Sequence, residues 1–319
     1  MKFDIATLGE ILIDFTESGK SEAGMRLFEQ NPGGAVANVV CAAAKLGKKT
    51  SFIGKIGDDM HGVFLRDTLE KAGVDTSGMV IGKDVFTTLA FVSLSENGER
   101  TFSFARKPGA DTQLSISEVN RQILQNTAIF HIGSLSMTDE PSRSATFYAV
   151  TEAKKAGAII SYDPNYRPSL WKSREQAIDQ MRSILSQVDI IKISDEETEL
   201  LTGMQHPEDA AAELIRMGIF CVAITLGKNG ALVCTKDGMA RVPSFKTKVV
   251  DTTGAGDSFW GAFLYCLLES GLQPSGLKLE NVIEFARFGN AAASICVGKR
   301  GAIPAMPGLD EAKKLLGSI

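Results

Sequence analysis

Residues 249–263 read VVDTTGAGDSFWGAF and combine small residues, a carboxylate and the start of an apolar, helix-like run. Gly254, Ala255 and Gly256 leave the backbone bare, and Asp257 follows them directly. The amino terminus of a helix has unpaired N–H groups and partial positive charge, so a glycine turn leading into a helix can bind an anion. The stretch therefore predicts an anion site beside an acid, and the helix dipole should keep Asp257 ionised.

The common nucleotide-binding fingerprints do not fit this sequence. The Gly-Lys-Ser at residues 19–21 lacks a Walker A partner, because Asp14 stands where the first glycine is required. A dinucleotide motif starting at Gly254 also fails, because Phe259 occupies the position of its third glycine. An anion site at this turn must therefore be of another kind.

A second group of residues could bind a polar small molecule. Asp14 closes the strand-like run EILIDF, and Asn38 lies in the first turn of the helical pattern VANVVCAAAKLG. Between them, Gly33 and Gly34 would let a ligand approach the backbone closely. Ligands of α/β proteins gather at the carboxyl ends of strands, so we expect these residues to line one pocket.

A third group lies in DPNYRPSLW, residues 163–171, which follows the apolar run AIISY. Asp163, Asn165 and Arg167 occupy alternate positions of a segment that two prolines restrict to extended conformations. Alternation in an extended segment predicts that the three side chains point the same way. Arg106, at the end of a predicted hairpin, is similarly placed to reach a ligand.

Elements that could position these residues follow a regular order. Strand-like runs such as TSFIGKIG alternate with helical patterns such as HGVFLRDTLEKAG, which predicts a mostly parallel sheet with helices on both faces. Residues 87–106 instead alternate with period two around Asn97-Gly98, a strong hairpin signal. With the non-helical segment near the amino terminus, this predicts a small β-sheet lid from insertions at about 15–32 and 86–109. We expect one α/β domain over residues 1–319.

Composition excludes several classes of protein. Lys and Arg number 34 against 38 Asp and Glu, and this net charge of -4 gives no general reason to bind nucleic acid or an anionic membrane. No apolar run reaches membrane-spanning length, and Asp4, Glu10 and Asp14 interrupt any signal peptide. The five cysteines are widely separated and we expect reduced core residues, which predicts a cytoplasmic location. The three histidines lie far apart and are assigned no catalysis.

Two strings resemble a known family. DTTGAGDSFWGAF, residues 251–263, is closely similar to the carboxyl-terminal signature of the ribokinase-like (PfkB) carbohydrate kinases. NPGGAVANVVCAAAKLG, residues 31–47, resembles the amino-terminal signature of the same family, and the resemblance extends over essentially the whole chain. It implies a ribokinase-like fold, a β lid, and transfer of the γ-phosphoryl group of ATP to a sugar hydroxyl.

The resemblance also implies roles for individual residues. The N–H groups of Gly254, Ala255 and Gly256 would bind the transferring phosphoryl group, and Asp257 would accept the proton of the sugar hydroxyl. The residues that would bind the sugar are Asp14, Gly33, Gly34, Asn38, Arg106, Asp163 and Arg167. The residues that would contact ATP are Ser194, Thr225, Gly227, Gly254, Gly256 and Asn290.

The same resemblance implies binding of metal ions. Mg²⁺ accompanies ATP and is commonly held through water, phosphate oxygens and few carboxylates. Glu197 matches the Glu of the family's N-x-x-E element, in which Ser194 replaces the Asn, so it is implied as a water-mediated Mg²⁺ contact. Many relatives also bind a monovalent cation, usually K⁺, whose ligands would here include Asp251, Thr253 and Gly301.

The choice of sugar rests on FARKPGAD, residues 104–111, and IKISDEETELLTG, residues 191–203, which are similar to bacterial and plant fructokinases. They imply that fructose is converted to fructose 6-phosphate, with 2-keto-3-deoxygluconate and ribose as alternative substrates. A sugar- or nucleotide-sensing binding protein on the same fold would be expected to lose the acid or the glycine turn, and both are intact. Relatives often pair through their lids, so the resemblance also implies a homodimer.

Overall fold

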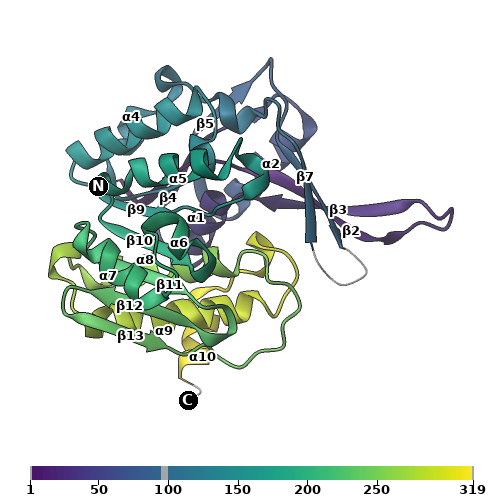
Figure 1. The fold of residues 1–319 in the computed structure, drawn as a ribbon. Helices are drawn as coiled ribbons and strands as arrows, with labels where there is room; N and C mark the ends of the chain where they lie inside the picture. Colours follow the sequence, from purple (N-terminus) through teal and green to yellow (C-terminus); the bar gives the residue numbers. More distant parts are fainter. Residues whose placement is uncertain (1, 95–99, 318–319) are drawn as a thin grey trace.

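The computed structural model describes residues 2–94 and 100–317, and these residues form a nine-stranded and a four-stranded sheet (Figure 1). The large sheet has the order β13-β12-β11-β10-β9-β8-β1-β4-β5 and is parallel except at β12 and β13. Its strands are β1 Phe3–Leu8, β4 Thr50–Gly57, β5 Val74–Gly82, β8 Thr127–Gly133, β9 Ile159–Asp163, β10 Ile190–Ser194, β11 Cys221–Thr225, β12 Ala231–Thr235 and β13 Gly238–Val242.

Helices cover both faces of the large sheet, as the sequence predicts. On one face, Val39 and Phe263 pack with Ile5, and on the other Ala149 packs with Phe130. No helix of the described residues is both long and apolar enough to cross a bilayer. The first face carries α1 Ala35–Lys45, α2 Met60–Lys71, α8 Ala255–Ser270 and α9 Leu279–Cys296, with α10 Leu309–Leu316 against α9. The second carries α3 Arg121–Leu124, α4 Ser142–Lys155, α5 Arg174–Ser183, α6 Thr198–Thr202 and α7 Pro207–Arg216.

Helix α8 is apolar over most of its surface, because it lies between the sheet and its neighbours α1 and α9. It crosses α1 at Gly261. A Cβ atom at this position would lie 2.6 Å from Cβ of Ala42 and 2.8 Å from the carbonyl oxygen of Val39. The close crossing brings the amino-terminal turns of both helices to the same edge of the sheet.

The small sheet consists of two antiparallel strand pairs that project from one side of the molecule (Figure 1). Strands β2 Leu12–Lys20 and β3 Arg26–Gly33 form the first, and β6 Leu89–Leu94 and β7 Arg100–Ala105 form the second. A parallel pairing of β2 with β6 joins them. The α/β fold with an additional small sheet is therefore confirmed, whereas the predicted Asn97-Gly98 turn lies outside the described residues.

Candidate active site

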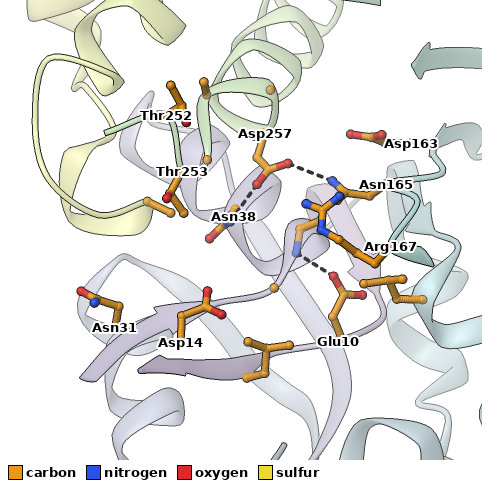
Figure 2. Close-up of a pocket in the computed structure, with 18 of the residues that line it drawn as sticks. Glu10, Asp14, Asn31, Asn38, Asp163, Asn165, Arg167, Thr252, Thr253 and Asp257 are labelled. Atoms are coloured by element: carbon orange, nitrogen blue, oxygen red, sulfur yellow. Dashed lines mark hydrogen bonds between the residues drawn. The ribbon is translucent and has the colours of Figure 1, made fainter. Parts of the chain in front are cut away.

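A cavity of about 400 Å³ lies between the carboxyl ends of β9, β10 and β11, the start of α8, and the small sheet (Figure 2). Alternate residues of β2, namely Leu12, Asp14 and Thr16, line it, so the small sheet presents one face to the cavity. The sequence-predicted residues that line this cavity are Asp14, Gly34, Asn38, Asp163, Arg167, Ser194, Glu197, Thr225, Asp251, Thr253, Gly254, Ala255, Gly256, Asp257 and Gly301.

The amino terminus of α8 has the geometry of the predicted anion site. Gly254 precedes the helix with φ 75°, a left-handed conformation that favours glycine. A Cβ atom there would also lie 2.7 Å from Cβ of Ala302. At Gly256, a Cβ atom would lie 2.9 Å from Nζ of Lys192, so this ammonium group lies directly against the turn. A helix terminus and a lysine ammonium together attract a negative group.

Asp257 is buried between two asparagine side chains (Figure 2). Asn38 donates to one carboxylate oxygen at 2.7 Å, and Asn165 donates to the other at 3.4 Å. Burial raises the pKa of Asp257 to about 6, with Lys192 lowering it and Asp163 raising it further. We expected the helix dipole to keep this pKa low, and burial outweighs that effect. Asp257 is therefore a stronger base than an exposed aspartate while still mostly ionised at neutral pH.

Lys192 is a buried cation that the sequence analysis did not identify as functional. Its Nζ donates to Asp163 at 2.7 Å, and both side chains are almost fully buried. Burial lowers the pKa of Lys192, but the carboxylates of Asp163 and Asp257 raise it more, so the ammonium form is retained. Asp163 thus orients a cation instead of presenting an unpaired acid to the cavity. A lysine inside the apolar run DIIKIS was the signal that could have identified it.

The segment after β9 is not extended as predicted. Asn165 has φ 52°, which is left-handed, so the alternation of Asp163, Asn165 and Arg167 does not hold. This turn points Asn165 at Asp257 and lets the N–H of Tyr166 donate to Glu197 at 2.6 Å. Arg167 nevertheless lines the cavity (Figure 2).

Close packing explains the glycine pair at the other end of the cavity. Gly34 has φ 114°, and a Cβ atom there would overlap the backbone carbonyl of Glu10. A Cβ atom at Gly33 would overlap the carboxylate of Asp14, although Gly33 itself does not line the cavity. A side chain at Gly34 would therefore displace the backbone at Glu10, and one at Gly33 would displace the carboxylate of Asp14.

Glu10 is a second buried group to which the sequence analysis gave no role. It lines the cavity and accepts a hydrogen bond at 2.6 Å from the N–H of Ala35, the first residue of α1. The remaining carboxyl oxygen is buried with no hydrogen-bond partner in the described residues. Burial raises the pKa of Glu10 to about 7, Asp111 raises it further, and Arg106 lowers it. An acid inside the apolar run TLGEILIDF was the available signal.

Three more predicted residues do not line the cavity. The guanidinium of Arg106 is buried and bonded to Asp111, Thr138 and the carbonyl of Leu135. The amide of Asn290 donates to the carbonyls of Val242 and Pro243. Their contacts with sugar and ATP, and the contact of Gly227 with ATP, stay predictions. The predicted site residues that do not line the cavity are Gly33, Arg106, Gly227 and Asn290.

The predicted metal contacts consist of oxygen donors, which fits hard cations. Glu197 accepts from the N–H of Ser194 at 2.7 Å and from the N–H of Tyr166, so its carboxylate is oriented by backbone donors and suits contact through water. Asp251 accepts from the N–H of Thr253 at 2.9 Å and from that of Gly301 at 3.1 Å. Among described residues, no cluster of three or more His, Cys, Asp or Glu residues could form a metal cage by itself.

A cavity at the carboxyl ends of parallel strands, a helix terminus suited to an anion and a buried acid are the features expected of a phosphotransferase site, and the fold is ribokinase-like. The chain belongs to the pfkB family of carbohydrate kinases, whose family model matches residues 2–308. Fructokinase-1 of Oryza sativa subsp. japonica is similar to it, with 44% identity over 98% of each chain.

Solved structures of fructokinases are also similar to this chain. The fructokinase of Xylella fastidiosa with bound ATP is 34% identical, with a TM-score of 0.92, covering 100% of this chain and 99% of that one. The fructokinase of Vibrio cholerae O395 with fructose, ADP and calcium ion is 30% identical, with a TM-score of 0.88, covering 99% and 100%. A double mutant of that enzyme with fructose, ADP and potassium ion is 30% identical, with a TM-score of 0.87 and 99% coverage of both chains.

Proposed function

We propose that this protein is an ATP-dependent sugar kinase that transfers the γ-phosphoryl group to the 6-hydroxyl of fructose. The observation that carries the proposal is Asp257, a buried carboxylate at the start of α8, held by Asn38 and Asn165 beside the ammonium of Lys192. Its position places a base and an anion site at one point of the cavity. That arrangement serves the transfer of a phosphoryl group to a hydroxyl.

Each group has a separate task in the proposed reaction. Asp257 accepts the proton of the attacking hydroxyl, and its raised pKa improves it as a base. The backbone N–H groups at the start of α8, together with Lys192, stabilise negative charge on the transferring phosphoryl oxygens. Little covalent chemistry is required of the protein, so positioning of these groups supplies most of the rate.

Fructose is favoured over the two alternative sugars by the similarity to fructokinases along nearly the whole chain. Asp14, Gly34 and Asn38 line the half of the cavity formed by β2 and α1, where they would hold sugar hydroxyls. The carboxylate of 2-keto-3-deoxygluconate would need a cation. Among described lining residues the cations are Arg167 and Lys192, and Lys192 is already paired with Asp163.

A nucleotide and a metal ion complete the proposal. Relatives were solved with ATP, or with ADP and calcium or potassium ion, which supports a requirement for both. We assign Mg²⁺ to a water-mediated contact with Glu197, where it would neutralise phosphate charge. ATP would extend past Ser194 and Thr225, and K⁺ would bind at Asp251, Thr253 and Gly301.

Two further assignments concern the whole chain. A homodimer through the small sheet is supported by the exposed apolar side chains of Met25, Leu27 and Phe28 on and beside β3. A cytoplasmic location is supported by the cysteines, which are all unpaired thiols in the described residues.

The experiment that tests the function is ADP release by purified protein with Mg-ATP, with and without K⁺. The acceptors are fructose, ribose, 2-keto-3-deoxygluconate, fructose 6-phosphate and adenosine. We expect turnover with fructose, and a fall in kcat of at least about 1,000-fold in Asp257→Asn with little change in the KM for fructose, because the substitution removes the base but keeps the shape. Rapid turnover with a different sugar would be consistent with the proposed mechanism but would overturn the choice of fructose as substrate. Turnover with none of them would favour a binding protein.

A further inference from the structure

Lys45 ends helix α1 with its ammonium group among backbone carbonyls rather than in solvent. Its Nζ donates to the carbonyl oxygens of Ile303 at 2.6 Å, Met306 at 3.2 Å and Pro304 at 3.5 Å. The side chain is half-buried, and this burial lowers the pKa of Lys45. Lys45 belongs to the amino-terminal motif of residues 31–47, and neither the sequence analysis nor the proposed mechanism gives it a role.

The carbonyls need this donor because the segment that carries them is anchored in the core. The side chains of Ile303, Ala305 and Met306 are buried and pack in the same apolar cluster as Val40 of α1. Backbone carbonyls drawn inward by such packing lose water and require a replacement partner. An ammonium group has three donors and can serve several carbonyls at once. Its charge is also favoured at the carboxyl terminus of α1.

The same segment touches the anion site at two points. Ala302 lies against Gly254, so closely that a Cβ atom at Gly254 would be 2.7 Å from Cβ of Ala302. One residue earlier, the N–H of Gly301 donates to Asp251 at 3.1 Å, and Asp251 in turn accepts from the N–H of Thr253 at 2.9 Å. Segment 301–306 therefore supports the turn at residues 252–256 both by packing and by hydrogen bonds.

We propose that Lys45 is a positioning residue for phosphoryl transfer, whose ammonium group holds segment 301–306 against the turn that begins α8. This inference rests on the proposed function. Lys45 does not line the cavity, so it acts only through the segment. Donors at a reacting centre must be placed to within about 0.5 Å, and a displacement of about 1 Å can lower a rate about 100-fold.

The test compares Lys45→Met with a matched control, Lys154→Met. Lys154 lies in the last turn of α4 and donates to the carbonyl of Gln187 at 2.6 Å, and it does not line the cavity. With fructose and Mg-ATP, we expect kcat of Lys45→Met to fall about 10–100-fold with the KM for fructose within about threefold, because the sugar contacts lie elsewhere in the cavity. Lys154→Met should keep kcat, and Lys45→Arg should recover part of it, since a guanidinium also donates to several carbonyls.

Hydrogen exchange provides a readout that does not depend on turnover. In Lys45→Met, backbone amides of residues 301–306 and 252–258 should both exchange faster than in wild type, and in Lys154→Met they should not. Faster exchange confined to 301–306, or an unchanged kcat with a lowered Tm, would overturn the proposal and leave Lys45 a structural residue. If Lys45→Met does not fold, Lys45→Gln, which keeps two donors, is measured in the same way. Failure of wild type to phosphorylate any sugar would instead overturn the proposed function, and exchange would still test the coupling.

Discussion

At the scale of single residues, the environment of Asp257 decides how the site can work. Its carboxylate lies at the positive end of α8, which favours ionisation, but burial opposes ionisation more strongly. The hydrogen bond from Asn38 and the charge of Lys192 limit the rise, leaving a pKa of about 6. With this pKa, the carboxylate is mostly ionised at neutral pH and is still basic enough to accept a proton.

This pKa predicts the acid limb of the activity profile. Asp257 must be ionised to act as a base, so kcat/KM for fructose should fall tenfold per pH unit below about 6. An exposed aspartate, with a pKa near 3.9, would keep full activity to about pH 5. The measurement is kcat/KM from pH 4.5 to 8.5 with saturating Mg-ATP. If the fall in kcat/KM at low pH persists in Glu10→Gln, it is assigned to Asp257. If the fall disappears, it is assigned to Glu10.

At the scale of elements, helices α1 and α8 meet near their first turns, which carry Asn38 and Asp257. The crossing of α1 and α8 at Gly261 sets the distance between Asn38 and Asp257. No side chain within its own sequence caps α1. Glu10, which precedes β2, supplies that acceptor to the N–H of Ala35. The start of α1 is thus fixed by tertiary contacts and not by its own residues.

Glu10 should make folding stability depend on pH. Its pKa rises from an ordinary 4.5 to about 7 on folding, so between these values the native state binds more protons than the unfolded state. Stability conferred by the protonated form should therefore be lost as pH rises from about 4.5 to 7, by an upper limit of about 3 kcal/mol. Urea unfolding at pH 5 and pH 8 measures the difference. In Glu10→Gln, which keeps an acceptor for the N–H of Ala35, the free energy of unfolding should differ less between the two pH values. An equal difference in both proteins would contradict the argument that burial raises the pKa of Glu10.

At the scale of the whole molecule, the small sheet has one face on the cavity and exposed apolar side chains on its edge strand β3. Leu12 and Asp14 line the cavity, whereas Phe15 stacks on Phe91. On β3, the apolar side chain of Leu27 is 46% exposed, and such an exposed apolar side chain suits contact with a second copy of the chain.

Pairing through this sheet predicts a dimer in solution. Light scattering during size exclusion should give about twice the chain mass of 34.2 kDa. Leu27→Asp should shift the protein to the monomer mass because it places a charge in the apolar contact. Met217→Asp, at an exposed methionine that follows α7 and lies outside the small sheet, serves as the control and should stay dimeric. A monomeric wild type at micromolar concentration would rule out the pairing.

Features that depend on neighbouring residues were determined by the sequence alone. The glycine turn before α8, the alternation of strands and helices, and the small sheet built from two insertions follow from local spacing, because backbone geometry is set by residues close in the chain. The family signatures at residues 31–47 and 251–263 likewise identified a sugar kinase before any contact was known.

Only the tertiary structure decided which distant groups meet and how they ionise. Lys192, Asn165 and Asp257 are separated by 27 to 92 positions and come together because parallel strands end at one edge of the sheet. The raised pKa values of Asp257 and Glu10 arise from burial, which depends on the packing of the complete chain. Desolvation cannot be inferred from a pattern of residue types. The sequence therefore predicted candidate reacting residues, but not the electrostatics around them.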